Sequence, residues 1–200
     1  YEESQLVAIQ EEMKLLSYIS EGIKNEEFTA VLQPKINIET GEIESFEALA
    51  RWTSKEIGFV SPAVFIPVAE NTGNIHRVDK SIFRKILHWL KGRQDAGKEL
   101  YQVAVNISPG HFYHRSFVEN MVELIEQYGI DTKYVKFEIT ESIELENILR
   151  AKKIMTDLKS YGIATAIDDF GVGYSSLSYL QELPFDEIKI DKSFIDNLAD

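Results

Sequence analysis

Polar side chains recur at one place in successive extended segments of this 200-residue chain, at or near the end of each segment. Alternate residues of a strand share a face, so Asn106 lies on the face opposite to Val105, and Asp168 on the face opposite to Ile167. Apolar residues fill that second face, as a layer of covering helices requires. The polar set comprises Glu47, Asn106, Glu138, Asp168 and Asp169, and Lys189 lies on the corresponding face of the last extended segment.

If these strand ends converge, four carboxylates share one pocket. Carboxylates at short range raise one another's pKa and cannot all stay ionised without a cation. Oxygen ligands without His or Cys suit a hard divalent ion such as Mg²⁺ or Mn²⁺. Two such ions that share a bridging carboxylate can hydrolyse a phosphodiester by in-line attack of a metal-activated water.

Each of these residues also has a simpler interpretation. Asp168 and Asp169 could be a strand end and a helix N-cap, Glu138 a solvated acid, and Lys189 a surface lysine. Their joint occurrence at matching positions on successive strands favours a common site. A histidine pair at helical spacing, His111 and His114, has no third ligand in view, so it does not predict a metal site.

Alternating strands and helices must position the polar set. Strands near residues 104, 137, 166 and 188 are separated by helical segments, which predicts strand-helix units and a parallel sheet. In a barrel of such units, catalytic groups collect at the C-terminal mouth. Helices are expected from Ser61-Pro62 onward and over about 76–97, 111–128 and 145–161.

Two extended segments precede these units, over 28–38 and 43–52, and the turn 39–42 joins them. A short connection that contains glycine predicts an antiparallel hairpin. Glu47, Leu49 and Arg51 share one face of its second strand, and Gln33 lies on the neighbouring strand.

The first 24 residues predict an amphipathic helix, with apolar residues at steps of three and four. These are Leu6, Ile9, Met13, Leu16 and Ile23, and Ser20 interrupts the pattern. We expect an entry helix that either continues from an upstream segment or docks on the domain.

Composition limits the partners of the chain. With 44% hydrophobic and 27% charged residues it is typical of a globular protein. The net charge of −12 disfavours binding to long nucleic acids. No run of 18 apolar residues predicts a membrane segment, there are no cysteines, and a cytoplasmic location is the default expectation.

The segment Phe46–Trp52, FEALARW, resembles the signature of EAL domains, bacterial phosphodiesterases that hydrolyse cyclic di-GMP to linear pGpG. The resemblance runs from about Phe28 to the end of the chain. It includes Leu32-Gln33-Pro34 and the segments 61–73, 105–108, 137–142, 168–176 and 189–191. It implies an α/β fold, a TIM-like barrel with an antiparallel first strand, with residues 1–24 as the entry helix and 25–200 as the EAL domain.

The resemblance also implies roles for single residues. Glu47, Asn106, Glu138 and Asp168 are expected to hold a first Mg²⁺ or Mn²⁺ ion, and Asp168 and Asp169 a second, whereas Ca²⁺ inhibits the family. Glu47 and Lys189 are the expected catalytic residues, since the lysine would orient the nucleophilic water. Gln33, Leu49 and Arg51 are expected to contact cyclic di-GMP. The glycine-rich segment matches a loop that links metal binding to dimerisation in the family.

The chain departs from the family pattern at Leu32, where an aromatic is usual, at Val172, where Thr or Ala is usual, and at Asp200, where it ends. The family's barrel continues past this point and supplies a further glutamate to the second metal. We therefore expect a barrel that is incomplete at the C-terminus, little or no turnover by this chain alone, and a longer homodimeric parent with an upstream sensor or diguanylate cyclase-like domain. A non-catalytic cyclic di-GMP sensor and a dimerisation module are the alternative functions.

Overall fold

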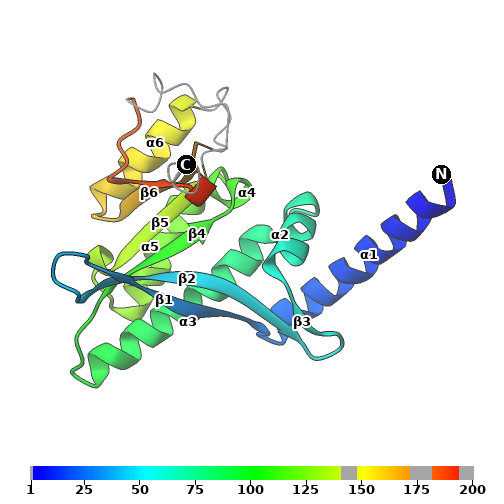
Figure 1. Cartoon of the computed structure of the whole chain (residues 1–200), viewed down its shortest axis with the longest axis horizontal. Coiled ribbons are helices and arrows are strands. Elements are labelled where there is room, and N and C mark those ends of the chain that lie inside the picture. Colours follow the sequence, from blue (N-terminus) through cyan, green and yellow to red (C-terminus); the bar gives the residue numbers. More distant parts are fainter. Residues whose placement is uncertain (1, 141–147, 172–181, 194–200) are drawn as a thin grey trace, which may run out of the picture.

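The computed structural model describes residues 2–140, 148–171 and 182–193 (Figure 1). Its helices are α1 Glu2–Lys24, α2 Pro62–Asn71, α3 Ile75–Asp95, α4 Pro109–Phe112, α5 Phe117–Tyr128 and α6 Ile148–Ser160, with a 3₁₀ turn at Thr132–Tyr134. Its strands are β1 Phe28–Ile36, β2 Ile43–Ser54, β3 Gly58–Val60, β4 Gln102–Ile107, β5 Val135–Thr140, β6 Ala164–Phe170 and β7 Glu187–Ile190.

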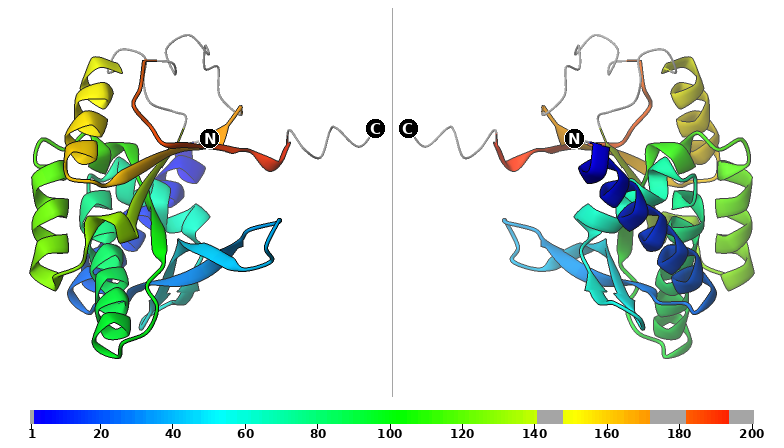
Figure 2. Two further views of the ribbon diagram at one scale, coloured as in Figure 1. Left: turned by 90° about the vertical axis from the view of Figure 1, so that its left-hand side faces the viewer. Right: turned by 90° about the vertical axis from the view of Figure 1, so that its right-hand side faces the viewer.

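The strands form one mixed sheet in the order β1-β2-β4-β5-β6-β7, with β3 paired to β2. The pairs β1–β2 and β2–β3 are antiparallel, and the remaining neighbours are parallel. In Figure 2 the helices α3, α5 and α6 stand on one side of the sheet, and the β1–β2 hairpin projects on the other. The predicted α/β architecture with an antiparallel first strand pair is confirmed.

The apolar face of the sheet packs under these helices as the alternation predicts. Val105, Phe137 and Ile167 are each 2% exposed or less. The expectation is wrong for β7, where Ile188 and Ile190 are 39% and 59% exposed. β7 is the last strand of the described sheet, and α6, the last described helix, packs on β6.

The predicted helix over 111–128 is divided into α4 and α5. Phe112 and Phe117 are both buried, and their ring centroids lie 5.7 Å apart. In one continuous helix, residues five apart would point about 140° away from each other. The break between α4 and α5 lets both rings enter the same core. The last predicted helix is described from Ile148 to Ser160, and residues 141–147 lie outside the described ranges.

The entry helix is present as α1, and its N-terminal part extends away from the other elements (Figure 1). Ile19 is fully buried, and Leu15, Tyr18 and Ile23 pack against the core. Met13, in the predicted apolar seam, is 66% exposed. The face of α1 that docks is therefore displaced from the seam that the sequence spacing indicates. None of the described helices is long and apolar enough to cross a membrane.

Candidate metal centre

Strand register places the predicted polar residues near one another on one face of the sheet. Glu47 on β2 pairs with Ala104 on β4, and Asn106 on β4 pairs with Glu138 on β5. One step further, Thr140 on β5 pairs with Asp168 on β6. Because paired residues of neighbouring strands point to the same face, these side chains gather on the face away from the helices.

Three carboxylates form the centre of the site. Glu47, Glu138 and Asp168 each offer an oxygen, and these oxygens lie within 4.8 Å of one another. Glu138 is 1% exposed. Asn106 Nδ2 donates to Glu47 Oε1 at 3.2 Å, so the amide orients the glutamate beside it.

Lys189 on β7 lies among the three carboxylates. Its Nζ is 2.8 Å from Glu138 Oε2, 3.0 Å from Glu47 Oε2 and 3.0 Å from Asp168 Oδ2. Burial by itself would lower the pKa of Lys189, but its hydrogen bonds and attraction to Glu138, Asp168 and Glu47 outweigh that effect and raise the pKa well above its usual range. Lys189 therefore stays an ammonium ion at neutral pH and partly offsets the clustered negative charge.

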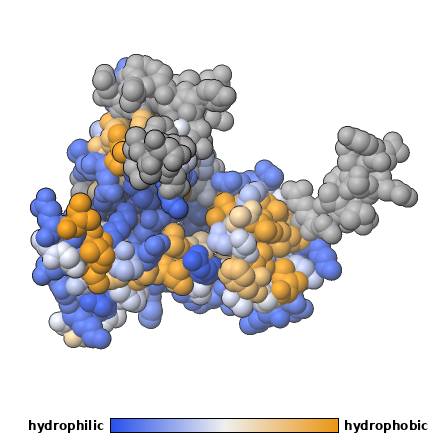
Figure 3. All heavy atoms as spheres, viewed as in Figure 1, coloured by the Kyte–Doolittle hydropathy of each residue, from blue (hydrophilic) through white to orange (hydrophobic). Residues whose placement is uncertain are grey.

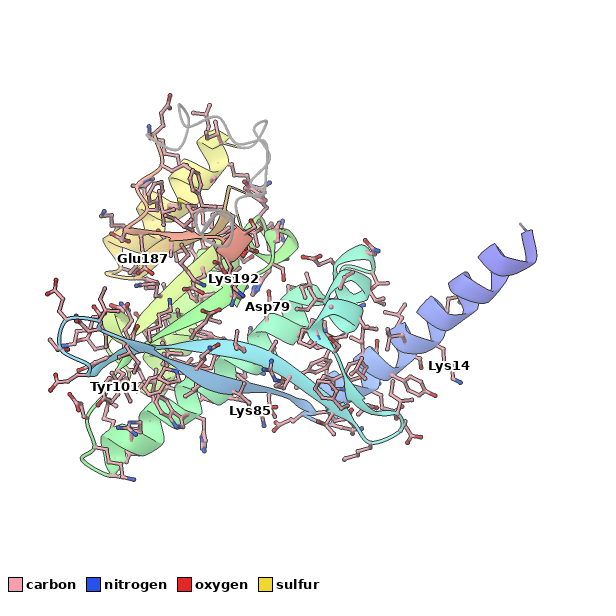
Figure 4. All side chains as sticks on the ribbon, in the orientation of Figure 1. Lys14, Asp79, Lys85, Tyr101, Glu187 and Lys192 are labelled. Carbon is pink, nitrogen blue, oxygen red and sulfur yellow. The ribbon has the colours of Figure 1, made fainter. Side chains whose placement is uncertain are left out.

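A second lysine, which the sequence analysis did not single out, completes the surroundings of Glu138. Lys35 Nζ on β1 donates to Glu138 Oε1 at 2.8 Å and lies 3.8 Å from Glu187 Oε1. Glu187, on β7 (Figure 4), also forms an ion pair with Lys136. The signal was present in the sequence, because Lys35 is two residues from Gln33 and so shares its face of the strand.

Asp169 lies beside this group and is more exposed than Asp168. Its backbone N–H donates to Asp168 Oδ1 at 2.9 Å, and its φ of 54° is in the left-handed region, which Asp tolerates better than most residues. Partial loss of hydration, together with the carboxylates of Asp168 and Asp191, raises the pKa of Asp169. Asp169 is not one of the three grouped ligands.

The three predicted substrate contacts lie on the strands next to the carboxylates. Gln33 pairs with Glu47 across β1 and β2. Leu49 is half-buried, and Arg51 Nη1 donates to the carbonyl of Ala50 at 2.8 Å. In the described structure, none of the three forms a hydrogen bond or ion pair with the carboxylates, so their roles stay predictions. The loop residues 172–176, Val172 included, lie outside the described ranges.

The donor set fits a hard divalent cation. Three carboxylates and one amide supply oxygen atoms only, which Mg²⁺ and Mn²⁺ prefer, and the carboxylates already converge on a positive group. The histidines do not compete for this role, because His111 Nδ1 lies 3.1 Å from Asp79 in a buried pair. Within the part of the chain that the structure describes, no other group of His, Asp or Glu side chains converges in this way.

The mixed α/β sheet with an antiparallel first strand pair matches the TIM-like barrels of solved EAL structures. A family model described as "EAL domain" matches residues 17–200, and the chain belongs to this family.

Two curated relatives and one solved structure illustrate the similarity. The uncharacterized protein y4lL of Sinorhizobium fredii is 44% identical over 83% of this chain and 20% of its own length. The cyclic di-GMP phosphodiesterase PA2567 of Pseudomonas aeruginosa is 36% identical over 96% of this chain and 33% of its own. The EAL enzyme Bd1971, in its cAMP and cyclic-di-GMP bound form, matches with a TM-score of 0.85 and 33% identity over 96% of this chain and 54% of its own. The chain thus spans a third or less of these curated relatives.

Proposed function

We propose that this chain carries the catalytic centre of a cyclic di-GMP phosphodiesterase, which hydrolyses one phosphodiester bond of the cyclic dinucleotide to give linear pGpG. The observation that carries the proposal is the grouping of Glu47, Glu138 and Asp168 from three strands of one sheet. The similarity to PA2567 supports the choice of substrate.

The carboxylates are proposed to hold divalent ions. Glu47, Asn106, Glu138 and Asp168 would hold one Mg²⁺ or Mn²⁺, and Asp168 and Asp169 a second. Such ions activate a water and neutralise charge on the phosphate oxygens. Glu138 is held by Lys35 on one oxygen, so its carboxylate keeps a fixed orientation toward the group.

Lys189 and the strand residues act on the substrate in this proposal. The Lys189 ammonium orients the attacking water and offsets negative charge that develops on the phosphoryl group. Arg51 suits a phosphate because its guanidinium presents several donors in a plane. Gln33 and Leu49 lie near Glu47 on the same pair of strands and would contact the rest of the dinucleotide.

Turnover of cyclic di-GMP tests this proposal. The longest natural form of the protein is incubated with cyclic di-GMP and Mg²⁺, Mn²⁺ or Ca²⁺, and pGpG is measured by chromatography. We expect product with Mg²⁺ and Mn²⁺ and none with Ca²⁺. Glu47→Ala should abolish turnover, and the exposed Glu56→Ala is the matched control.

Two results would contradict the proposal. Unchanged turnover in Glu47→Ala would remove Glu47 from the site. Binding of cyclic di-GMP without turnover in any metal would instead make the protein a sensor.

A further inference from the structure

A groove of about 700 Å³ runs along α3, next to the end of α1 and Tyr128 at the end of α5. It lies on the outer side of the helix layer, whereas the carboxylate group lies on the inner side of the sheet. Five lysines and arginines line it, together with His76, His88 and one acidic residue, Glu26. The lysines and arginines are Lys24, Arg77, Lys80, Arg84 and Lys85.

This concentration of positive charge contrasts with the rest of the chain. The chain has a net charge of −12, yet five of its 21 Lys and Arg residues line this one groove. The two acidic residues of α3 do not balance them. Asp79 is buried against His111, and Asp95 pairs with Lys91 in the last turn.

One carboxylate already occupies part of the groove. Lys85 lies on α3 and is labelled in Figure 4, and its Nζ is 2.6 Å from Glu26 Oε2. The hydrogen bond and the charge of Lys85, with a smaller contribution from Arg84, lower the pKa of Glu26. Glu26 reaches this position with a φ of 56°, a backbone conformation that a non-glycine residue seldom adopts. The groove therefore already binds one carboxylate oxygen, which belongs to the protein's own Glu26.

The other cations are less well compensated. Arg77 donates to Asn74 at 3.3 Å. Lys24, Lys80 and Arg84 form no ion pair or hydrogen bond with any described residue. Lys80 and Arg84 are four residues apart on α3, where like charges repel and weaken a helix. An anion bound between them would relieve that repulsion.

We propose that this groove binds a small ligand that carries two or more phosphate groups. Cations one turn apart along α3 are about 5.4 Å apart along the helix axis, so several phosphates of one ligand could each meet a positive group. Arg presents a planar set of donors that matches phosphate oxygens, and Lys adds point charges. The volume is that of a small-molecule site, and the net charge disfavours a long nucleic acid.

Binding of inorganic tripolyphosphate to the full chain tests the proposal. Isothermal titration calorimetry is run at low ionic strength with EDTA, so that the probe does not chelate a metal. The double variant Lys80→Ala, Arg84→Ala removes two groove cations, and Ala preserves the helix. Lys55→Ala, Lys98→Ala is the matched control, because both lysines are exposed, lie outside the groove and change the net charge equally.

We expect the wild type and the control to bind the probe, with an affinity that falls as salt is added. The groove variant should bind at least about tenfold more weakly, the effect of losing two charge-assisted hydrogen bonds. Absence of binding, equal binding by the groove variant, or equal loss in the control would each overturn the proposal.

A second experiment, with lipid vesicles, distinguishes a free ligand from a lipid headgroup. Vesicles of phosphatidylcholine that contain phosphatidylglycerol are sedimented with the protein. No co-sedimentation is expected, because the groove is concave and a flat bilayer surface cannot enter it. Co-sedimentation that the groove variant loses would assign the groove to a lipid surface and overturn the small-ligand proposal.

Discussion

Lys189 is the residue on which the charge balance of the carboxylate group depends. It contacts Glu47, Glu138 and Asp168 at once, and Glu138 has almost no contact with water. A buried carboxylate that loses its partner is strongly destabilising. The requirement for a cation, which the sequence predicts from the carboxylates alone, is met here in part by a side chain of the protein.

Replacing this lysine should therefore weaken the fold when no metal is present. In EDTA, we expect Lys189→Met to lower the free energy of unfolding by about 1–3 kcal/mol, because Glu138 Oε2 loses its donor and three carboxylates repel one another. Mn²⁺ should raise the melting temperature more in the variant than in the wild type, since no ammonium competes for the same oxygens. Thermal unfolding with and without Mn²⁺ measures both effects, and the exposed Lys98→Met is the control. Equal melting temperatures in EDTA would contradict the prediction.

Glu187 links stability to acidic pH. Burial would raise its pKa, but the hydrogen bond and charge of Lys136, with Lys35 and Lys189, lower it overall. The pKa of Glu187 is therefore lower in the folded state than in the unfolded state. Its ion pair stabilises the fold above the unfolded-state pKa, about 4.3, and this stabilisation is lost as the pH falls through the folded-state pKa.

The Lys136→Met variant tests this linkage. At pH 7 urea unfolding should give a free energy of unfolding that is lower by up to about 1 kcal/mol, a modest effect because solvent screens the partly exposed Glu187. Between pH 5 and pH 3, roughly the range in which carboxylates titrate, the variant should lose less stability than the wild type. Parallel loss of stability in the two proteins would show that the ion pair does not stabilise the fold.

At the scale of elements, the contact between α1 and the β1–β2 hairpin depends on Gly22. A Cβ at this position would lie 2.9 Å from Trp52 Nε1 and 3.2 Å from Phe28 Cε2. Trp52 Nε1 donates to Glu27 Oε2, and its ring stacks on Phe28 with centroids 5.0 Å apart. The docking of α1, which we propose to be a linking helix over residues 1–24, thus needs a residue without a side chain at Gly22.

Gly22→Val should disturb this contact. We expect a loss of about 1–3 kcal/mol in the free energy of unfolding, because the added methyl groups force the Trp52 and Phe28 rings to move. Gly92→Ala in α3 is the control, since nothing lies within 4 Å of its added Cβ, and alanine should stabilise the helix by about 0.5–1 kcal/mol. Chemical unfolding followed by tryptophan fluorescence checks both variants. An unchanged free energy of unfolding in Gly22→Val would contradict this prediction and show that α1 packs loosely.

At the scale of the whole molecule, the sheet curves without closing in the described residues. Lys35 on β1 reaches Glu138 on β5 and approaches Glu187 on β7, so the two edge strands bend toward each other. In Figure 3, apolar residues gather at the β1–β2 hairpin, where Ile36, Ile38 and Ile43 are exposed. Exposed apolar residues on edge strands favour association with another chain.

The alternation of polar and apolar residues along single strands was enough to predict the grouping of Glu47, Glu138 and Asp168, because successive side chains of every strand point to opposite faces of the sheet. It could not predict which strands come together across the barrel, so Lys35 was missed as a partner of Glu138. The break after Phe112 and the docked face of α1 were also missed, because both are decided by packing against other elements. The exposure of Ile188 and Ile190 depends on which neighbours cover β7, which the strand pattern does not specify.

Titration with Mn²⁺ tests most directly whether the carboxylate group is a metal centre. Binding is followed by electron paramagnetic resonance of free Mn²⁺ in the wild type, in Glu138→Gln and in the exposed control Glu56→Gln. We expect the wild type and Glu56→Gln to bind the ion and Glu138→Gln to bind it at least about tenfold more weakly, since this variant loses a charged ligand. Equal Mn²⁺ binding by Glu138→Gln and the wild type would contradict this expectation.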